Sequence, residues 1–122
     1  MTHHNKLTWQ QANREAESRL AMVLDQVAQV TTMTGERPTH IPLTDYPTVE
    51  DYTRLLGDNP GWCWEEHRMI NQAMARLLSR QKLKVRKVSV RADDFLAWCM
   101  MNGKKNTTAT RAEYAASIRE KG

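Results

Sequence analysis

The longest regular element of this chain is encoded by residues 8–35, TWQQANREAESRLAMVLDQVAQVTTMTG. Thr8, followed three residues later by Gln11, forms a capping box, in which each side chain accepts a hydrogen bond from the other residue's backbone N–H. Gly35 is the residue type that most often ends a helix in the left-handed conformation. The stretch therefore predicts a helix over about residues 9–33.

Apolar residues recur along this first helix at the spacing of one helical face, which predicts the side that it buries. The same residues fit a 3.5-residue repeat for about three heptads, a pattern typical of paired helices. The pair could form within the fold or in a homodimer through the first helix. The short run and its lack of charge pairs favour the fold. The face comprises Trp9, Ala12, Ala16, Leu20, Val23, Val27 and Val30.

An extended connection and a short helix are expected next. Three prolines between residues 36 and 47 remove backbone donors and hold the residues before them outside the helical region. Thr48 with Asp51 then forms a second capping signal, and Gly57 is a suitable stop. We expect a two-turn helix over about residues 48–56.

A third helix is predicted over about residues 60–80, because Asp58-Asn59-Pro60 has the pattern of an N-cap followed by proline at the first helical position. Trp64 falls outside its apolar face, and such an aromatic side chain is a candidate for a protein interface. The apolar face comprises Cys63, His67, Ile70, Ala73, Met74, Leu77 and Leu78, and the opposite face Arg68, Gln72, Arg76 and Ser79.

Residues 80–91, RQKLKVRKVSVR, contain six lysine or arginine residues and no acidic residue. Apolar residues alternate with them, but the alternation shifts by one position near Arg86-Lys87. Because such a shift turns later side chains to the other face, residues 82–90 predict a bulged strand or two very short strands with a turn. The partner strand is expected at residues 39–43, or in a second copy that would form a homodimer through the basic strand.

Two further helices are expected after this strand. Ala92 or Asp93 begins the first, which ends at Asn102-Gly103. Thr110 with Glu113 forms a capping box that predicts a last helix, to about Arg119. The loop between the two helices is longer than in helix-turn-helix proteins, so we expect a packed helical hairpin rather than a DNA-reading helix.

These elements predict a mainly α fold: a single small domain over residues 1–122, with about five helices and a short β-strand or hairpin near residues 82–90. Residues 1–7 are expected to form a flexible tail. A composition of 40% apolar and 26% charged residues is typical of a folded protein. No apolar run approaches the roughly 20 residues of a membrane span, and no signal-peptide pattern occurs, so we expect no membrane partner. Two cysteines fit a reducing cytoplasm.

Charge is distributed unevenly along the chain. Residues 1–60 contain 5 basic and 8 acidic side chains, whereas residues 61–122 contain 13 basic and 6 acidic ones. A basic half attracts anionic partners, although lysines also protect an exposed sheet edge from aggregation. The predicted contacts to nucleic acid or to an acidic protein surface are Arg76, Arg80, Lys82, Lys84, Arg86, Lys87, Arg91, Lys104 and Lys105.

Neither enzymatic activity nor a cofactor is expected. The sequence contains no nucleophile-elbow, phosphate-loop or dinucleotide-binding glycine motif. Cys63 and His67 lie one helical turn apart, with Cys99 elsewhere, but the paired short spacings of a structural zinc site are missing. No metal site is therefore predicted, and a hydrogen-bonded core histidine is the expected role of His67.

The favoured function is that of a small basic, non-enzymatic protein that contacts nucleic acid mainly through its phosphate backbone. The alternative is a protein-binding adaptor or inhibitor, in the style of phage and plasmid accessory proteins. Such a protein would act on a nucleic-acid-handling complex through Trp64 and the same basic surface.

Overall fold

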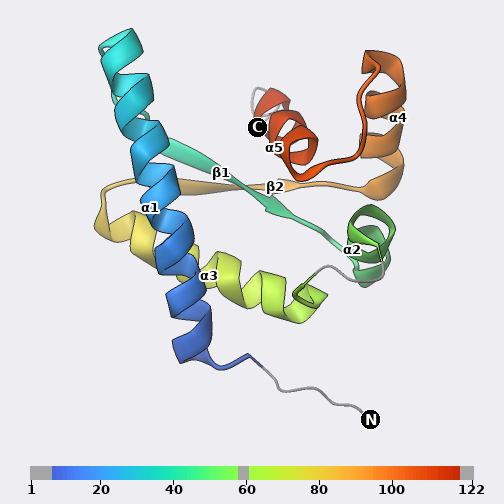
Figure 1. Cartoon of the computed structure of the whole chain (residues 1–122), viewed down its shortest axis with the longest axis horizontal. Helices are drawn as coiled ribbons and strands as arrows, with labels where there is room; N and C mark the ends of the chain where they lie inside the picture. The colour runs from blue at the N-terminus through green and yellow to red at the C-terminus, as the bar shows by residue number, and fades with distance from the viewer. Residues whose placement is uncertain (1–6, 58–60, 119–122) are drawn as a thin grey trace. The chain divides into compact units, whose positions relative to one another are not determined.

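A computed structural model of the chain describes residues 7–57 and 61–118 (Figure 1). These residues form a mainly α structure, as predicted. The predicted N-cap at Asp58-Asn59 and residues 1–6 of the predicted tail lie outside the described residues. Leu7, which was assigned to that tail, is buried. The elements are α1 (Trp9–Thr34), β1 (His40–Asp45), α2 (Val49–Leu56), α3 (Trp64–Arg80), β2 (Lys84–Ser89), α4 (Ala92–Asn102) and α5 (Thr108–Ser117).

The chain divides into two compact units, which are described separately. Unit 1 contains the described residues up to Ile41 together with Glu65–Val85, and unit 2 contains Pro42–Trp64 and Arg86 onwards. A single domain over the whole chain therefore stays a prediction. Across residues 7–57 and 61–118, no helix has both the length and the apolar character needed to cross a membrane.

Unit 1 is built around the long helix α1, which begins and ends as its sequence predicts. Thr8 and Gln11 form the capping box, with N···O distances of 2.9 and 3.1 Å, and Gly35 ends the helix in the left-handed conformation. The predicted apolar face is only partly correct. Trp9 is 46% exposed and Val30 is also exposed, and the fully buried side chains of this helix are mainly small.

The second helix of unit 1, α3, buries the apolar face that its spacing predicts. Ile70, Ala73, Met74 and Leu78 are buried, and the opposite polar face is exposed. Cys63 was wrongly assigned to this face, because the helix begins one residue later and the thiol is exposed. Figure 1 shows α1 crossing α3. The Arg76 guanidinium of α3 lies over the ring of Trp9, in the first turn of α1.

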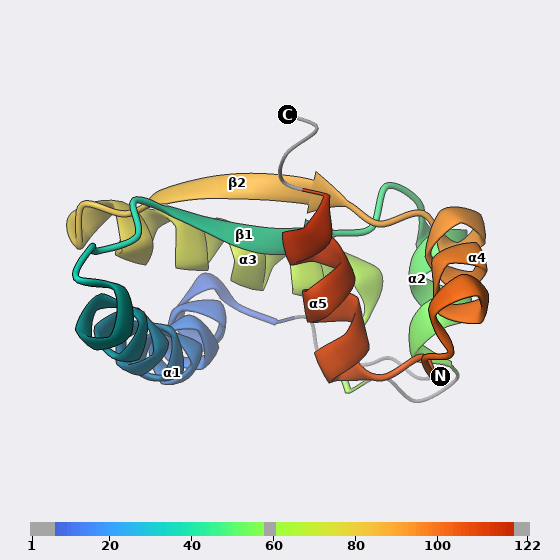
Figure 2. The same cartoon turned by 90° about the horizontal axis from the view of Figure 1, so that it is seen from above.

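The two strands form a two-stranded parallel sheet, so the predicted hairpin is wrong and the predicted partner segment is confirmed (Figure 2). The Lys84 N–H donates to the Thr39 carbonyl and the Val90 N–H to the Asp45 carbonyl, each at 2.8 Å. Both pairs have a sequence separation of 45 residues, so the register is the same at the two ends. The alternative of two short strands with a turn is also wrong, because β2 is continuous.

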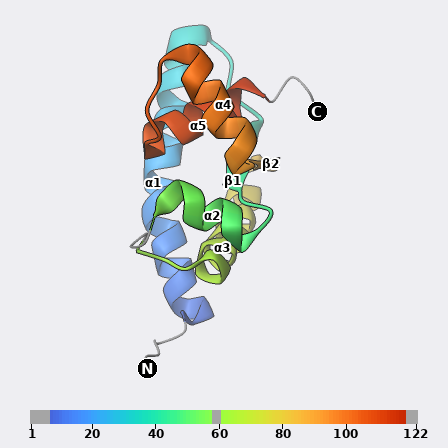
Figure 3. The same cartoon turned by 90° about the vertical axis from the view of Figure 1, so that its right-hand side faces the viewer.

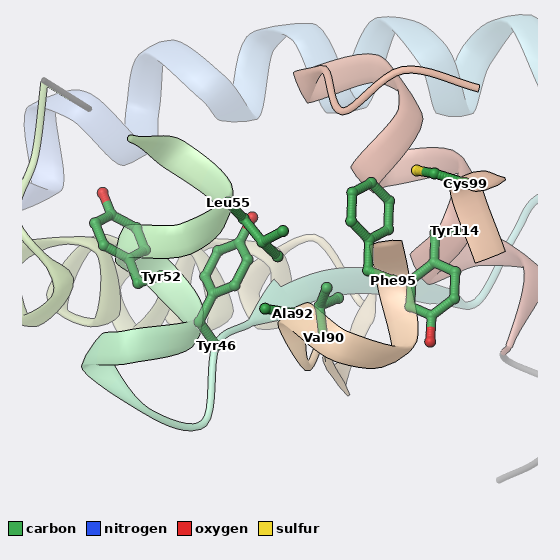
Figure 4. Close-up of a cluster of buried hydrophobic side chains, with 8 residues drawn as sticks. All are labelled: Tyr46, Tyr52, Leu55, Val90, Ala92, Phe95, Cys99 and Tyr114. Carbon is green, nitrogen blue, oxygen red and sulfur yellow. The ribbon is translucent and has the colours of Figure 1, made fainter. Parts of the chain in front are cut away.

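Unit 2 has an aromatic core (Figure 4). The rings of Phe95 and Tyr114 meet edge to face at 5.3 Å between centroids, and those of Tyr46 and Tyr52 at 5.4 Å, the geometry that aromatic pairs prefer. Helix α4 packs against both α2 and α5, as Figure 3 shows for α2 and α4. The core residues are Tyr46, Tyr52, Leu55, Val90, Ala92, Phe95, Cys99 and Tyr114.

Hydrogen bonds tie the helices of unit 2 to one another. Asp51 Oδ1 accepts from the Ala92 N–H at 2.8 Å, and its Oδ2 accepts from the Thr48 hydroxyl at 2.8 Å. One carboxylate thus caps α4 while it supports the cap of α2. Asn106 Nδ2 donates to the Leu55 carbonyl at 2.7 Å, which fixes the loop before α5 to the end of α2.

The last helix begins three residues earlier than its sequence predicted. The N-cap is Thr107, whose hydroxyl accepts from the Thr110 N–H at 3.1 Å. Thr110 itself is buried inside the first turn, where its hydroxyl lies 2.8 Å from that of Thr107. The capping box expected at Thr110 and Glu113 is therefore wrong, because a chain of threonines offers several caps and tertiary packing selects one.

Candidate nucleic-acid interface

The predicted cations of the central stretch follow one another along α3, a turn and β2. We call this set the basic segment: Arg76, Arg80, Lys82, Lys84, Arg86, Lys87 and Arg91. Its first four members belong to unit 1 and its last three to unit 2. All except Arg86 are exposed.

Lys82 occupies the turn that ends α3. Its φ of 61° is the only left-handed value at a non-glycine residue in the described part of the chain. The Lys82 N–H donates to the Ser79 carbonyl at 3.0 Å and the Leu83 N–H to the Leu78 carbonyl at 2.9 Å, the two bonds of a Schellman motif. Leu78 and Leu83, at the two positions where this motif usually has apolar residues, are both buried. A lysine therefore occupies the position at which glycine is normally found.

Burial along β2 explains the shift in its apolar pattern. Leu83 is buried and Val85 half-buried in unit 1, whereas Val88 and Val90 are buried in unit 2. The alternation changes phase where the strand passes from one unit to the other, so each half of the strand serves a different core. Lys84 and Lys87, which lie between these positions, are exposed, whereas Arg86 is half-buried.

Arg86 lies at this change of phase and is half-buried. Its Nη2 is shielded from solvent and has no hydrogen-bond partner among the described residues. A buried N–H without an acceptor costs about 1–3 kcal/mol. Like Lys82, Arg86 is thus a cation whose position does not favour the stability of the fold.

Arg37 is a cation that the sequence did not single out. Its Nη2 donates to the Gln81 carbonyl at 3.0 Å, which places an exposed guanidinium beside the turn that carries Lys82. Forty-four residues separate the two partners, and Glu36 precedes Arg37. Only the pairing of β1 with β2 brings Arg37 to this turn.

Arg91 is the N-cap residue of α4, but its side chain makes no capping hydrogen bond. The carboxylate that caps this helix belongs to Asp51, and the N–H of Ala92 is the main reason that the pKa of Asp51 lies below its ordinary value. The hydroxyl of Thr48 and the charges of Arg91 and Arg54 lower the pKa further, whereas partial burial raises it. Part of the charge of Arg91 is therefore balanced within unit 2.

Lys104 and Lys105 are not brought to β2. They follow α4, whose 11 residues separate them from Arg91 by about 16 Å at the rise of an α-helix. Lys104 Nζ also lies 3.4 Å from Glu113 Oε2 and is the only one of the nine predicted cations with an ion pair in the described part of the chain. We therefore leave both lysines out of the candidate interface.

Trp64, predicted as an interface residue, packs against the aromatic core of unit 2. Its indole N–H donates to the Tyr46 carbonyl at 2.8 Å. A half-buried ring whose polar atom is already bonded presents little surface to a partner. The structure thus gives Trp64 a structural role that is sufficient to explain its presence.

His67 is half-buried, and its Nε2 lies 3.4 Å from Asn71 Nδ2. No cluster of three or more histidine, cysteine or acidic side chains suited to a metal forms within residues 7–57 and 61–118. Neither Cys63 nor Cys99 forms a disulfide, and burial raises the pKa of Cys99.

Comparison with models of known protein families gives no match, and no curated protein is similar in sequence.

Proposed function

We propose that this chain is a non-enzymatic protein that binds nucleic acid, mainly through contacts between the basic segment and the phosphate backbone. The proposal rests on two cations in positions that cost stability. Lys82 takes a left-handed backbone conformation, and Arg86 has a buried N–H without an acceptor. Local strain of this kind is concentrated at functional sites, where the ligand rather than the fold explains the residue.

The arrangement of the basic segment favours a polymeric anion over a small one. Its cations follow one another along the last turns of α3, the turn at Lys82 and positions 84, 86 and 87 of β2, rather than converging on one loop. A small anion is held by donors that converge on one point, whereas phosphates of a nucleic acid recur along a line. A nucleic-acid ligand fits a cytoplasmic protein, and so do two cysteines that form no disulfide.

The experiment is a titration with fluorescent single-stranded DNA, duplex DNA and RNA over a series of salt concentrations. One variant, Lys82→Gln/Lys84→Gln, removes two charges from unit 1, and a second, Lys87→Gln/Arg91→Gln, removes two from unit 2. We expect each to weaken binding and to reduce the slope of log affinity against log salt by about 1.4–1.8. Circular dichroism of each variant establishes that the helices are retained.

The matched control is Lys104→Gln/Lys105→Gln, which removes the same charge from the α4–α5 loop. The ion pair that Lys104 forms with Glu113 in the wild type is exposed and contributes about 0–1 kcal/mol. We expect the salt slope of this control to equal that of the wild type. Absence of wild-type binding at low salt would exclude the proposal. An equal loss of affinity in all three double variants would show that affinity depends on net charge alone and not on the basic segment.

A second candidate function is binding to a protein partner. It is supported by exposed apolar side chains at the end of α4. Met100 and Met101 are both 85% exposed. Methionine is enriched at adaptable protein interfaces, where its flexible side chain fits different surfaces. Lys105 follows these residues and would suit an acidic partner.

This second candidate predicts that Met100→Gln/Met101→Gln captures less of an acidic protein than the wild type does. Thermal stability and nucleic-acid affinity should not change. The measurement is quantitative capture of proteins from a lysate by the wild type and by this variant. Identical capture profiles would exclude the methionine pair as an interface.

A further inference from the structure

The first turn of α1 and the exposed face of α3 place an aromatic ring against a cation in unit 1. The Arg76 guanidinium carbon lies 5.1 Å from the centroid of the Trp9 ring. Both side chains are exposed, Trp9 by 46%. A ring in the buried core of unit 1 would have no such access to solvent, so the indole is available to a planar ligand.

Arg76 belongs to a polar ridge on α3. Gln72, Arg76 and Arg80 are spaced four residues apart, so they lie on one side of the helix about 6 Å from one another along its axis. All three are exposed. The ridge leads along α3 to the turn at Lys82, within unit 1.

No carboxylate balances this pair within the described residues. Arg76 has no ion pair in residues 7–57 and 61–118, and the first turn of α1 contains no acidic residue. The first turns of α2, α3 and α4 each contain two acidic residues. The Trp9 ring therefore lies in surroundings that attract a polyanion.

The chemistry of such a pair suits one class of ligand. A guanidinium binds a phosphate, and stacking on the indole limits its motion, so less side-chain entropy is lost on binding. An exposed indole stacks on an unpaired base, whereas the bases of a duplex are already stacked on each other. We propose that Trp9 and Arg76 form a stacking site for an unpaired base, and that the ligand of the basic segment is single-stranded nucleic acid.

This inference rests on the proposed function, because the phosphates of the single-stranded nucleic acid are held by the basic segment. The test therefore compares ligands with and without bases. The variants Trp9→Ala and Trp9→Phe are titrated with a single-stranded oligonucleotide, a blunt duplex of equal length and inorganic polyphosphate. Helix content by circular dichroism checks that both variants fold.

We expect Trp9→Ala to weaken single-strand binding by about 5- to 150-fold, the effect of losing one stacked base. Polyphosphate binding should change less than twofold, since polyphosphate has no base. Trp9→Phe retains a ring and should recover most of the affinity. Quenching of tryptophan fluorescence by the bound oligonucleotide should be reduced in Trp9→Phe relative to the wild type.

The outcomes separate this inference from the proposed function. An equal loss of single-strand and polyphosphate affinity in Trp9→Ala would overturn the stacking site, but it would not contradict the proposal that the basic segment binds phosphates. Tighter binding of the duplex, unaffected by Trp9, would overturn the single-strand preference alone. If the wild type binds none of the three ligands, both proposals fail.

Discussion

The long helix α1 of unit 1 and the shorter helix α4 of unit 2 each bury three side chains, but they do so in different ways. Those of α1 are spread over 26 residues and two of the three are alanines, whereas those of α4 fall within 11 residues and include Phe95. Burial of a large ring contributes more than burial of a methyl group. Unit 2 thus has a concentrated aromatic core, whereas α1 leaves Trp9, Met22, Val30 and Met33 exposed.

This contrast assigns different roles to the two units. The side chains of the aromatic core of unit 2 are enclosed, so little of them can contact a ligand. In unit 1, Trp9 and the cations of α3 remain accessible and are not explained by packing alone. Stability should therefore respond more to changes in α4 than to changes in α1, and binding should depend strongly on unit 1.

The largest expected effect is that of Phe95→Ala. Phe95 is fully buried and contacts the rings of Trp98 and Tyr114, so its removal leaves a cavity in the core of unit 2. We expect a loss of about 3–5 kcal/mol in the free energy of unfolding, measured by urea denaturation. The control is Met33→Ala in unit 1, which changes an 84% exposed side chain and should have an effect within about 0.5 kcal/mol. Equal losses would refute the contrast between α4 and α1.

The next largest effect is expected at Asp51, which supports two helices of unit 2. Asp51→Ala removes the acceptor of the Ala92 N–H and the partner of Thr48, and should cost about 1–2 kcal/mol. Asp51→Asn keeps one acceptor and should cost less. Thermal melts of the wild type, Asp51→Asn and Asp51→Ala at neutral pH should show melting temperatures that fall in this order.

The same residue gives a pH dependence with a definite sign. Because the pKa of Asp51 is lowered in the folded protein, its stabilisation is complete above the ordinary value of 3.8 and is lost as the pH falls through the folded value. The stability difference between the wild type and Asp51→Asn should therefore shrink below about pH 4. A difference that stays constant down to pH 2 would show that the charge of Asp51 does not stabilise unit 2.

A smaller effect is expected at the N-caps, which are chemically alike in the two units. Thr8→Ala removes the cap of α1 and Thr107→Ala that of α5, and each should cost about 1 kcal/mol. Thr107 also bonds the buried Thr110 hydroxyl, so the loss should be greater in unit 2. Denaturation of both variants under the same conditions tests this order, and a greater loss for Thr8→Ala would contradict it.

Local signals predicted most of the fold. The caps at Thr8 and Thr48 and the stops at Gly35 and Gly103 depend only on residues a few positions apart, and all four are confirmed. Long-range signals were weaker. The exposure of Trp9 was missed because helical spacing shows which residues share a face, but not how much of that face a neighbouring element covers.

The candidate site shows the same limit. The density of cations in residues 80–91 was visible in the sequence, whereas the strained conformation of Lys82 was not, because a lysine gives no sign of a left-handed turn. Arg37 was missed because it reaches the turn only through strand pairing. Lys104 and Lys105 were grouped with the basic segment on charge alone, which takes no account of the length of α4 between them.

The smallest expected change in stability is also the most informative about function. A left-handed conformation costs a side-chain-bearing residue about 1–2 kcal/mol, and the freedom of glycine in the unfolded chain offsets about 0.5–1 kcal/mol of that. Lys82→Gly should therefore raise the free energy of unfolding by roughly 0.5–1 kcal/mol, measured by urea denaturation. Gln81→Gly, at the neighbouring residue without a left-handed φ, should lower it instead.

If Lys82 contacts phosphate, this more stable variant should bind single-stranded nucleic acid more weakly and reduce the salt slope by about 0.7. Gain of stability with loss of binding in one substitution is the result expected when a residue is retained for its ligand. A variant that gains stability and keeps full affinity would show that the strain at Lys82 is unrelated to binding. Arg86 would then be the remaining cation whose position costs stability. Its replacement by methionine removes the unpaired N–H and should stabilise the protein while weakening binding.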